Sequence, residues 1–309
     1  MGIATDAVAG GRPGRLQATS AGSNLGAFGM AEWAMLAAIA TVWGSSFLFM
    51  EIGLQSFRPG VITLARVLLG AAGLAIFPRA RRAVERQDLP RIALLGVTWM
   101  GIPLILFPVA QVWIDSSVAG MINGAVPLTS AAWAAVLLRR LPVRTQVLGL
   151  TLGFLGVVAI SWPEFRESQA SALGVGLIVA AVVLYGLSTN IAVPLQHKYG
   201  SLPVLLRAQL AALVLVVPFG VWSLPGSVWA WDSAAAMLPL GLLGPGLAFV
   251  LMATLVGRVG GPRGAVAIYF VPIVAIALGG VILGEPVTPL ALLGTALVLA
   301  GAWITSRSA

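Results

Sequence analysis

Cysteine is absent from the 309-residue sequence, and histidine occurs once, as His197. A chain without cysteine has no disulfide, no thiolate metal site and no thiol nucleophile. The single histidine stands beside Lys198, and no paired acidic motif or His/Glu metal spacing accompanies it. We therefore expect no enzyme activity, no metal and no other cofactor.

Charged residues are also scarce. They make up 9% of the chain, whereas 59% of it is hydrophobic and the mean hydropathy is +0.99. About a quarter of a typical soluble protein is charged, and the apolar runs here reach the roughly 20 residues that a transmembrane helix needs. The sequence therefore predicts a multi-pass protein of the lipid bilayer. The net charge of +8 does not indicate nucleic acid as a partner, because the arginines stand in short loops between apolar runs.

The expected fold class is an all-α membrane protein with ten transmembrane helices. Each apolar run is close to the length of one membrane crossing. The predicted helices are Met30–Leu54, Gly60–Phe77, Leu89–Trp113, Ser117–Leu138, Val143–Ile160, Ala172–Leu195, Ser201–Trp222, Ser233–Gly257, Gly264–Leu283 and Val287–Ser306.

These helices divide the chain into two halves with a tail and a linker. Residues 1–29 are rich in glycine, alanine and serine and lack the apolar core of a signal peptide, which predicts a disordered cytoplasmic tail. Residues 30–160 and 172–306 contain five helices each. Residues 161–171 are predicted to be an extracytoplasmic linker between them.

The second half repeats part of the first. Residues 117–160 align without a gap on residues 262–305, an offset of 145 positions, so that Pro127 matches Pro272 and Gly149 matches Gly294. Proline and glycine each determine a backbone feature of a membrane helix, so these matches carry more weight than matches between apolar residues. Because five is an odd number of crossings, the second half enters the membrane from the opposite side, and the repeats are predicted to be inverted.

The distribution of basic residues predicts the orientation. With both termini in the cytoplasm, fourteen of the eighteen basic residues fall on the inner side, and only Arg58 and Arg166 fall on the outer side. Cytoplasmic loops carry the excess of lysine and arginine in membrane proteins. We therefore expect a plasma-membrane protein with both termini inside. The first copy of the repeated hairpin, with Arg139 and Arg140, then faces the cytoplasm. The second copy, with Glu285, faces outward.

Inverted repeats are the usual construction of carriers that work by alternating access. A duplicated scaffold without a transport role is the alternative for the repeat itself. An integral membrane enzyme and a substrate-specific channel are the alternatives from other functional classes. The missing catalytic motifs and the absence of a ring of charged pore residues disfavour both.

Three short motifs resemble the EamA-type branch of the drug/metabolite transporter (DMT) superfamily. They are Trp43–Phe47 (WGSSF), Leu64–Arg66 (LAR) and Leu283–Thr288 (LGEPVT) leading to Gly294. The resemblance covers about Ala31 to Ile304 and implies a ten-helix bundle around a central substrate cavity, with export of amino acids or other small metabolites. The family often has Gly-Glu in both repeat hairpins, and this sequence departs from that pattern in the first copy.

Polar and aromatic side chains at mid-membrane depth are the candidates for a substrate site, because such groups are expensive to expose to lipid. In the first helix Trp43, Ser46, Phe47 and Met50 share one face, and a similar pattern begins at Tyr185 in the sixth. For the serines, hydrogen bonding between helices is an equally good interpretation. The predicted substrate-binding residues are Trp43, Ser46, Phe47, Gln111, Asn123, Tyr185, Ser188, Asn190 and Tyr269.

Two prolines and two arginines lie within the predicted helices. Pro127 leaves the carbonyl of Asn123 without its helical donor, so Pro127 and Pro272 either present backbone groups to a substrate or only kink packed helices. Arg66 and Arg207 lie one to two turns inside their helices. We predict a structural or gating role for them, with anchoring preferred to carboxylate binding.

The residue types predict a neutral or zwitterionic substrate with an apolar part, such as an amino acid. No acidic residue stands near the middle of a predicted helix, so a strongly cationic molecule would lack a counter-charge. The two arginines are expected too near the helix ends to form a phosphate clamp. The functional unit is expected to be a monomer or a homodimer.

Overall fold

The computed structural model describes residues 19–24, 26–114, 116–167, 171–278 and 288–307. Within these ranges the regular structure is helical, without a strand. The helices of the first half are α1 (Met30–Leu54), α2 (Pro59–Ala75), α3 (Leu89–Leu95), α4 (Ile102–Ala110), α5 (Ser116–Asn123), α6 (Val126–Leu138) and α7 (Arg144–Glu167). Those of the second half are α8 (Ala172–Tyr199), α9 (Ser201–Trp222), α10 (Trp231–Gly241), α11 (Phe249–Val259), α12 (Gly261–Ala265), α13 (Val271–Leu278) and α14 (Pro289–Arg307).

Eight helices of the described chain are long and apolar enough to cross a membrane. Two shorter apolar helices accompany them, Pro59–Ala75 and Gly261–Val274. The prediction of an all-α, multi-pass protein is therefore confirmed over the described ranges, while ten crossings and inverted halves stay predictions. Glu285 and the hairpin that contains it lie outside the described residues.

Two of the predicted helices contain a π-helical turn in the middle. The segment η3 (Gly96–Gly101) separates α3 from α4, and η4 (Leu242–Ala248) separates α10 from α11. An offset of 145 positions places 96–101 on 241–246, so the two turns occupy nearly the same place in each half. A π-helical turn inserts an extra residue and often occurs at functional sites.

Two further predicted helices are interrupted just before a proline. In the first half α5 ends at Asn123 and α6 begins at Val126, next to Pro127. In the second half the 3-10 segment η5 (Val266–Phe270) precedes α13, which contains Pro272. The missing amide hydrogen of each proline accounts for the position of both interruptions.

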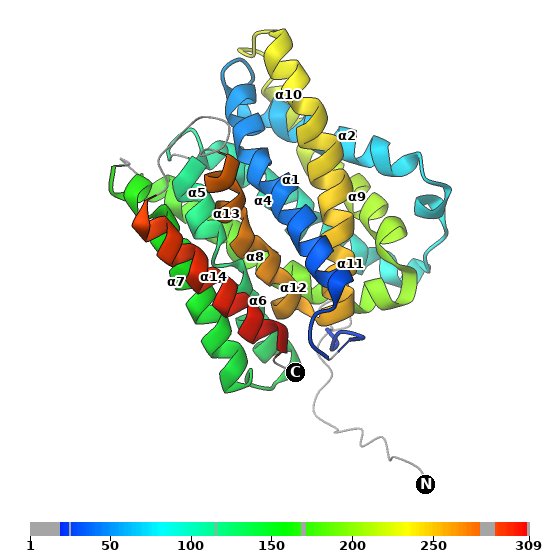
Figure 1. The fold of residues 1–309 in the computed structure, drawn as a ribbon. Coiled ribbons are helices and arrows are strands. Elements are labelled where there is room, and N and C mark those ends of the chain that lie inside the picture. Colours follow the sequence, from blue (N-terminus) through cyan, green and yellow to red (C-terminus); the bar gives the residue numbers. More distant parts are fainter. Residues whose placement is uncertain (1–18, 25, 115, 168–170, 279–287, 308–309) are drawn as a thin grey trace.

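The repeated glycines lie where α7 packs against α14. A Cβ atom added at Gly156 would lie 2.6 Å from the carbonyl oxygen of Gly294, and one added at Gly301 would lie 2.5 Å from that of Gly149. Small residues allow membrane helices to approach this closely. The two helices run side by side along one edge of the bundle, and α2 and α9 lie along the opposite edge (Figure 1).

Contacts between the halves follow a reciprocal pattern. Two helices of the first half pack against their own counterparts in the second half: α2 packs against α9, and α7 packs against α14. The contact of α6 with α8 corresponds in the same way to that of α13 with α1. The same reciprocity holds for two glycines, since Gly186 packs on Thr129 in α6 and Gly44 packs on Val271 in α13.

Basic side chains gather at the end of the bundle where α1 begins and α8, α11 and α14 end; we call it the basic end. Lys198 pairs there with Glu85 at 2.7 Å and with Asp88 at 2.8 Å. The cavities at this end are lined by Arg79, Arg82, Arg140, Arg258 and Arg263.

The segment before α1 differs from the predicted disordered tail, because its described residues from position 19 onward lie against the basic end. The amide of Ser23 donates to the carbonyl of Gly257 at 3.2 Å, and the amide of Asn24 donates to that of Arg258 at 2.6 Å. Arg263 donates to the carbonyl oxygens of Asn24 and Gly26. Backbone carbonyls at the end of α11 therefore accept hydrogen bonds from this segment. Amino-acid composition alone does not predict such contacts.

Candidate substrate cavity

A cavity of about 50 Å³ lies in the middle of the bundle, between helices of both halves. It has room for a few water molecules at about 10–15 Å³ each. A molecule larger than a few waters therefore fits only when the lining side chains move apart. The lining residues are Trp43, Ser46, Phe47, Met50, Arg66, Phe107, Asn123, Tyr185, Phe249 and Ile268.

The central part of α1 contributes one continuous face to this cavity. Trp43, Phe47 and Met50 follow the spacing of a helical stripe, which places them one above the other. Ser46 lies on the same face, but its hydroxyl donates to the carbonyl of Val42 at 2.7 Å, one turn back in its own helix. The α1 face is therefore mainly aromatic and apolar.

Aromatic rings from four helices surround the cavity. The rings of Phe107 and Tyr185 stack with centroids 5.8 Å apart and planes 22° from parallel. Phe47 meets Phe107 edge to face at 6.2 Å, and Trp43 meets Phe249 edge to face at 5.3 Å. These geometries are favourable for aromatic pairs. They form a wall suited to the apolar part of a small molecule.

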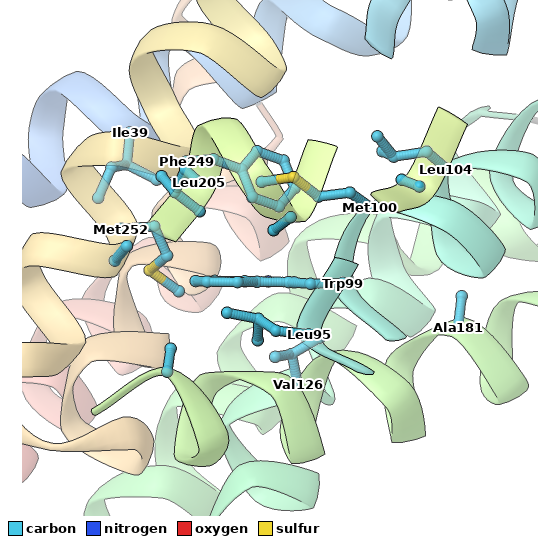
Figure 2. Packing of buried hydrophobic residues seen from close by; sticks show 14 of the residues in the cluster. Ile39, Leu95, Trp99, Met100, Leu104, Val126, Ala181, Leu205, Phe249 and Met252 are labelled. Atoms are coloured by element: carbon cyan, nitrogen blue, oxygen red, sulfur yellow. The ribbon is translucent and has the colours of Figure 1, made fainter. Parts of the chain in front are cut away.

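Below this wall, toward the basic end, the interior is packed. Trp99 is 2% exposed and meets Phe249 edge to face at 5.3 Å. Its indole lies between Phe249 and Met252 on one side and Leu95 and Val126 on the other (Figure 2). Because protein interiors pack as densely as organic crystals, this layer leaves little free space next to Phe249 of the cavity lining.

Arg66 lies near the middle of the 17-residue α2 and is 5% exposed. Its Nη1 donates to the thioether of Met50 at 3.6 Å, a weak contact, and its Nε has no partner among the described residues. No ion pair in the described chain includes Arg66. The expectation that it lies near a helix end is therefore wrong, because about two turns of α2 lie on either side of it. A buried cation without a counter-charge costs several kcal/mol.

Asn123 contributes the second polar group of the lining. It is the last residue of α5, directly before the interruption that precedes Pro127, and it is 7% exposed. Its side-chain oxygen is buried without a partner in the described chain. The interrupted helix thus places one unpaired amide oxygen beside the aromatic wall.

Ser188 and Asn190 were predicted to bind substrate, but neither lines this cavity. They follow Tyr185 by three and five residues, which moves them about 4.5 and 7.5 Å along α8 toward the basic end. Ser188 donates to the hydroxyl of Thr98 at 2.8 Å, and Asn190 donates to the carbonyl of Ser130 at 2.9 Å. Both side chains connect helices. Asn190 also borders a separate cavity of about 340 Å³ at the basic end.

Tyr269 and Gln111 also lie away from the lining. The Tyr269 ring is fully buried against Gly153 of α7, and its hydroxyl donates to the carbonyl of Leu150 at 2.7 Å. Gln111 follows the last residue of α4 and is partly exposed. Packing of η5 against α7 directs the tyrosine away from the cavity.

Arg207 lies in α9, away from the cavity lining, and stays a structural candidate. Its Nη1 donates to the carbonyl of Ala80 at 3.2 Å and to that of Pro203 at 3.1 Å. These acceptors lie in η1 (Pro78–Arg81) and in the first turn of α9, near the basic end. Arg207 and Arg66 therefore occupy different environments, although their positions in the sequence look alike.

Three lining residues had no prediction: Phe107, Phe249 and Ile268. Phe249 follows the π-helical turn η4 directly, and Phe107 lies one to two turns after η3. Helices interrupted by glycine and proline at corresponding places in two halves point to a binding site. Gly101 with Pro103, and Gly244 with Pro245, carried that signal in the sequence.

Comparison with known proteins gives a consistent assignment. The model of the EamA-like transporter family matches the sequence twice, over residues 31–162 and 172–307. A protein of Streptantibioticus cattleyicolor, named "Probable terminal-alkyne amino-acid exporter", is 30% identical over 286 residues, covering 90% of this chain and 93% of the relative. A protein of Archaeoglobus fulgidus, named "Uncharacterized transporter", is 25% identical over 287 residues, covering 90% and 99%.

Two further similarities extend this comparison. A protein of Escherichia coli named "Probable amino-acid metabolite efflux pump" is 23% identical over 283 residues, covering 86% of this chain and 91% of the relative. One solved crystal structure superposes with a TM-score of 0.75 at 18% identity, covering 90% of this chain and 99% of the other. The structural likeness establishes the fold alone.

Proposed function

Because the chain belongs to the EamA-like transporter family, we propose that it is a secondary transporter that exports small neutral or zwitterionic metabolites, such as amino acids, across the plasma membrane by alternating access. The observation that carries this proposal is the central cavity. Helices of both halves line it, and it combines an aromatic wall with two unpaired polar groups. Sites of this kind at the interface of two repeats are typical of carriers.

Export of amino acids is supported by the relatives. The names of the proteins from Streptantibioticus cattleyicolor and Escherichia coli refer to amino-acid export and to amino-acid metabolite efflux. An apolar amino acid also matches the lining, in which aromatic side chains outnumber polar ones. The direction of transport in this proposal rests on those names and on the family.

Alternating access is supported by the reciprocal construction of the bundle. The π-helical turns η3 and η4 stand at corresponding places, and so do the interruptions before Pro127 and Pro272. Exchanging the conformations of two such halves would move an opening from one side of the cavity to the other. Ten crossings with both termini in the cytoplasm belong to this proposal, on the strength of the basic loops.

A channel is the less favoured alternative, because buried Trp99 packs against Phe249 of the cavity lining within a dense apolar cluster. A channel needs a continuous path in one conformation, whereas a carrier needs a barrier on one side at a time. A membrane enzyme is the alternative from another class, and the sequence offers it one histidine and no cysteine for catalysis.

Counterflow of labelled phenylalanine in proteoliposomes tests the proposal. Wild-type protein should accumulate label against preloaded unlabelled substrate, and Trp43→Ala or Tyr185→Ala should lower the initial rate at least about tenfold, since each removes a large aromatic contact. Trp229→Ala is the matched control, because Trp229 is 65% exposed. Flux without counterflow would indicate a channel, and a chemically altered product would indicate an enzyme.

A further inference from the structure

Two polar groups without partners share the central cavity. The Nε of Arg66 and the side-chain oxygen of Asn123 are both buried and lack hydrogen-bond partners in the described chain. They come from different helices, α2 and α5, and both residues line the same space. Buried polar groups are nearly always satisfied, so two exceptions in one cavity call for a ligand that satisfies both.

The charge of Arg66 is not balanced by an acidic side chain that the structure describes. Glu32 pairs with Arg258 at the basic end, and Glu85 and Asp88 pair with Lys198. Glu51 follows Met50 in α1 but is exposed. An arginine within a membrane bundle usually faces a partner or a substrate path. The missing counter-charge is therefore expected to arrive with the substrate.

We propose that Arg66 binds the carboxylate of the transported molecule and that the Asn123 amide accepts a hydrogen bond from its amino group. The site would then take free α-amino acids whose apolar side chain packs on the Phe107 and Tyr185 rings. A guanidinium offers two parallel N–H donors that match the two oxygens of a carboxylate. An ammonium group has donors only, and an amide oxygen is a suitable acceptor. This inference rests on the proposed function, because it takes the cavity as the transport site.

The assignment gives each part of the substrate a separate partner, so single groups can be removed from the ligand instead of from the protein. Phenylalaninamide lacks the carboxylate and keeps the amino group and the ring. 3-Phenylpropanoate lacks the amino group and keeps the other two. A ligand that loses one charge-assisted hydrogen bond should bind about 10- to 100-fold more weakly.

The experiment measures competition for labelled phenylalanine by these compounds, with purified protein in proteoliposomes. For wild-type protein, phenylalaninamide should compete about 10- to 100-fold less well than phenylalanine. Arg66→Gln should weaken the binding of phenylalanine by a similar factor and leave the weak binding of phenylalaninamide nearly unchanged. Arg66→Lys should restore part of the lost affinity, because lysine provides the positive charge but not the two parallel N–H donors of a guanidinium. Asn123→Ala should weaken the binding of phenylalanine and leave that of 3-phenylpropanoate unchanged, because this compound lacks the amino group.

Arg207→Gln is the matched control, since this arginine also lies in a membrane helix but its partners are backbone carbonyls outside the cavity. It should leave the order of the ligands unchanged. The wild-type ligand series needs no variant, so a variant that fails to fold does not remove the test. Equal binding of phenylalanine and its amide, with intact counterflow, would overturn the carboxylate assignment and leave the transporter standing. If the wild type neither binds nor exchanges any of the three compounds, transport of apolar aromatic amino acids is refuted together with this inference.

Discussion

Replacing Gly156 by alanine should destabilise the contact between α7 and α14. The new Cβ would lie 2.6 Å from the Gly294 carbonyl oxygen and 2.7 Å from the Val298 amide nitrogen. Backbone atoms cannot turn aside, so the helices must separate. Overpacking of this kind costs about 1–3 kcal/mol, and the better helix propensity of alanine returns up to about 1 kcal/mol. We expect a net loss of up to about 2 kcal/mol.

Gly176 in α8 provides the matched control. A Cβ at that position meets nothing within 4 Å, so Gly176→Ala should be neutral or stabilise the helix by up to about 1 kcal/mol. The difference between the two alanine variants therefore isolates the helix–helix contact from the propensity of the residue itself.

A double-mutant cycle of Gly156→Ala and Gly294→Ala measures whether the two glycines act on the same contact. A Cβ at Gly294 would lie 2.7 Å from the Gly156 carbonyl oxygen, so the two glycines restrict the same gap. Once the first alanine has separated the helices, the second should cost less, with a coupling of about 0.5–3 kcal/mol. Thermal melting of the purified protein, followed by size-exclusion chromatography, measures each variant. Equal stability of Gly156→Ala and Gly176→Ala, or strict additivity in the cycle, would refute the proposed contact.

Three further predictions concern the ends of the bundle and one buried hydroxyl. Gly22→Leu should detach the N-terminal segment, because a Cβ at Gly22 would lie 2.4 Å from the backbone nitrogen of Gly260. In inverted vesicles, a single cysteine at Ser201 should then be labelled severalfold faster, since Ser201 lines the same cavity as Ser23. Gly26→Ala is the control, and equal labelling rates for the two variants would contradict the prediction. An impermeant thiol reagent should label a single cysteine at Ser227 on intact cells but not one at Ser201, and the opposite pattern would reverse the orientation. Tyr269→Phe should lower stability by about 1 kcal/mol without changing the order of competing ligands, whereas a changed order would place the hydroxyl in the substrate site.

The sequence by itself predicted the elements that depend on local composition. The bounds of α1 and α9 agree with the predicted Met30–Leu54 and Ser201–Trp222 residue for residue. Long apolar runs separated by short polar loops leave few alternatives, because a backbone in lipid must satisfy its hydrogen bonds within a helix. The 145-residue offset likewise anticipated matching interruptions before Pro127 and Pro272, since a missing amide hydrogen is a local property.

The tertiary structure alone decided which side chains face the cavity. These helices are apolar on all sides, so periodicity does not distinguish a cavity face from a face packed on a neighbour. Arg66 and Asn190 illustrate the result: the predicted anchor lies in the cavity, and the predicted cavity residue connects α8 to α6. The direction of each side chain follows from which helices pack together, and the same packing brings the N-terminal segment onto the basic end, where the carbonyls of Gly257 and Arg258 accept its amides.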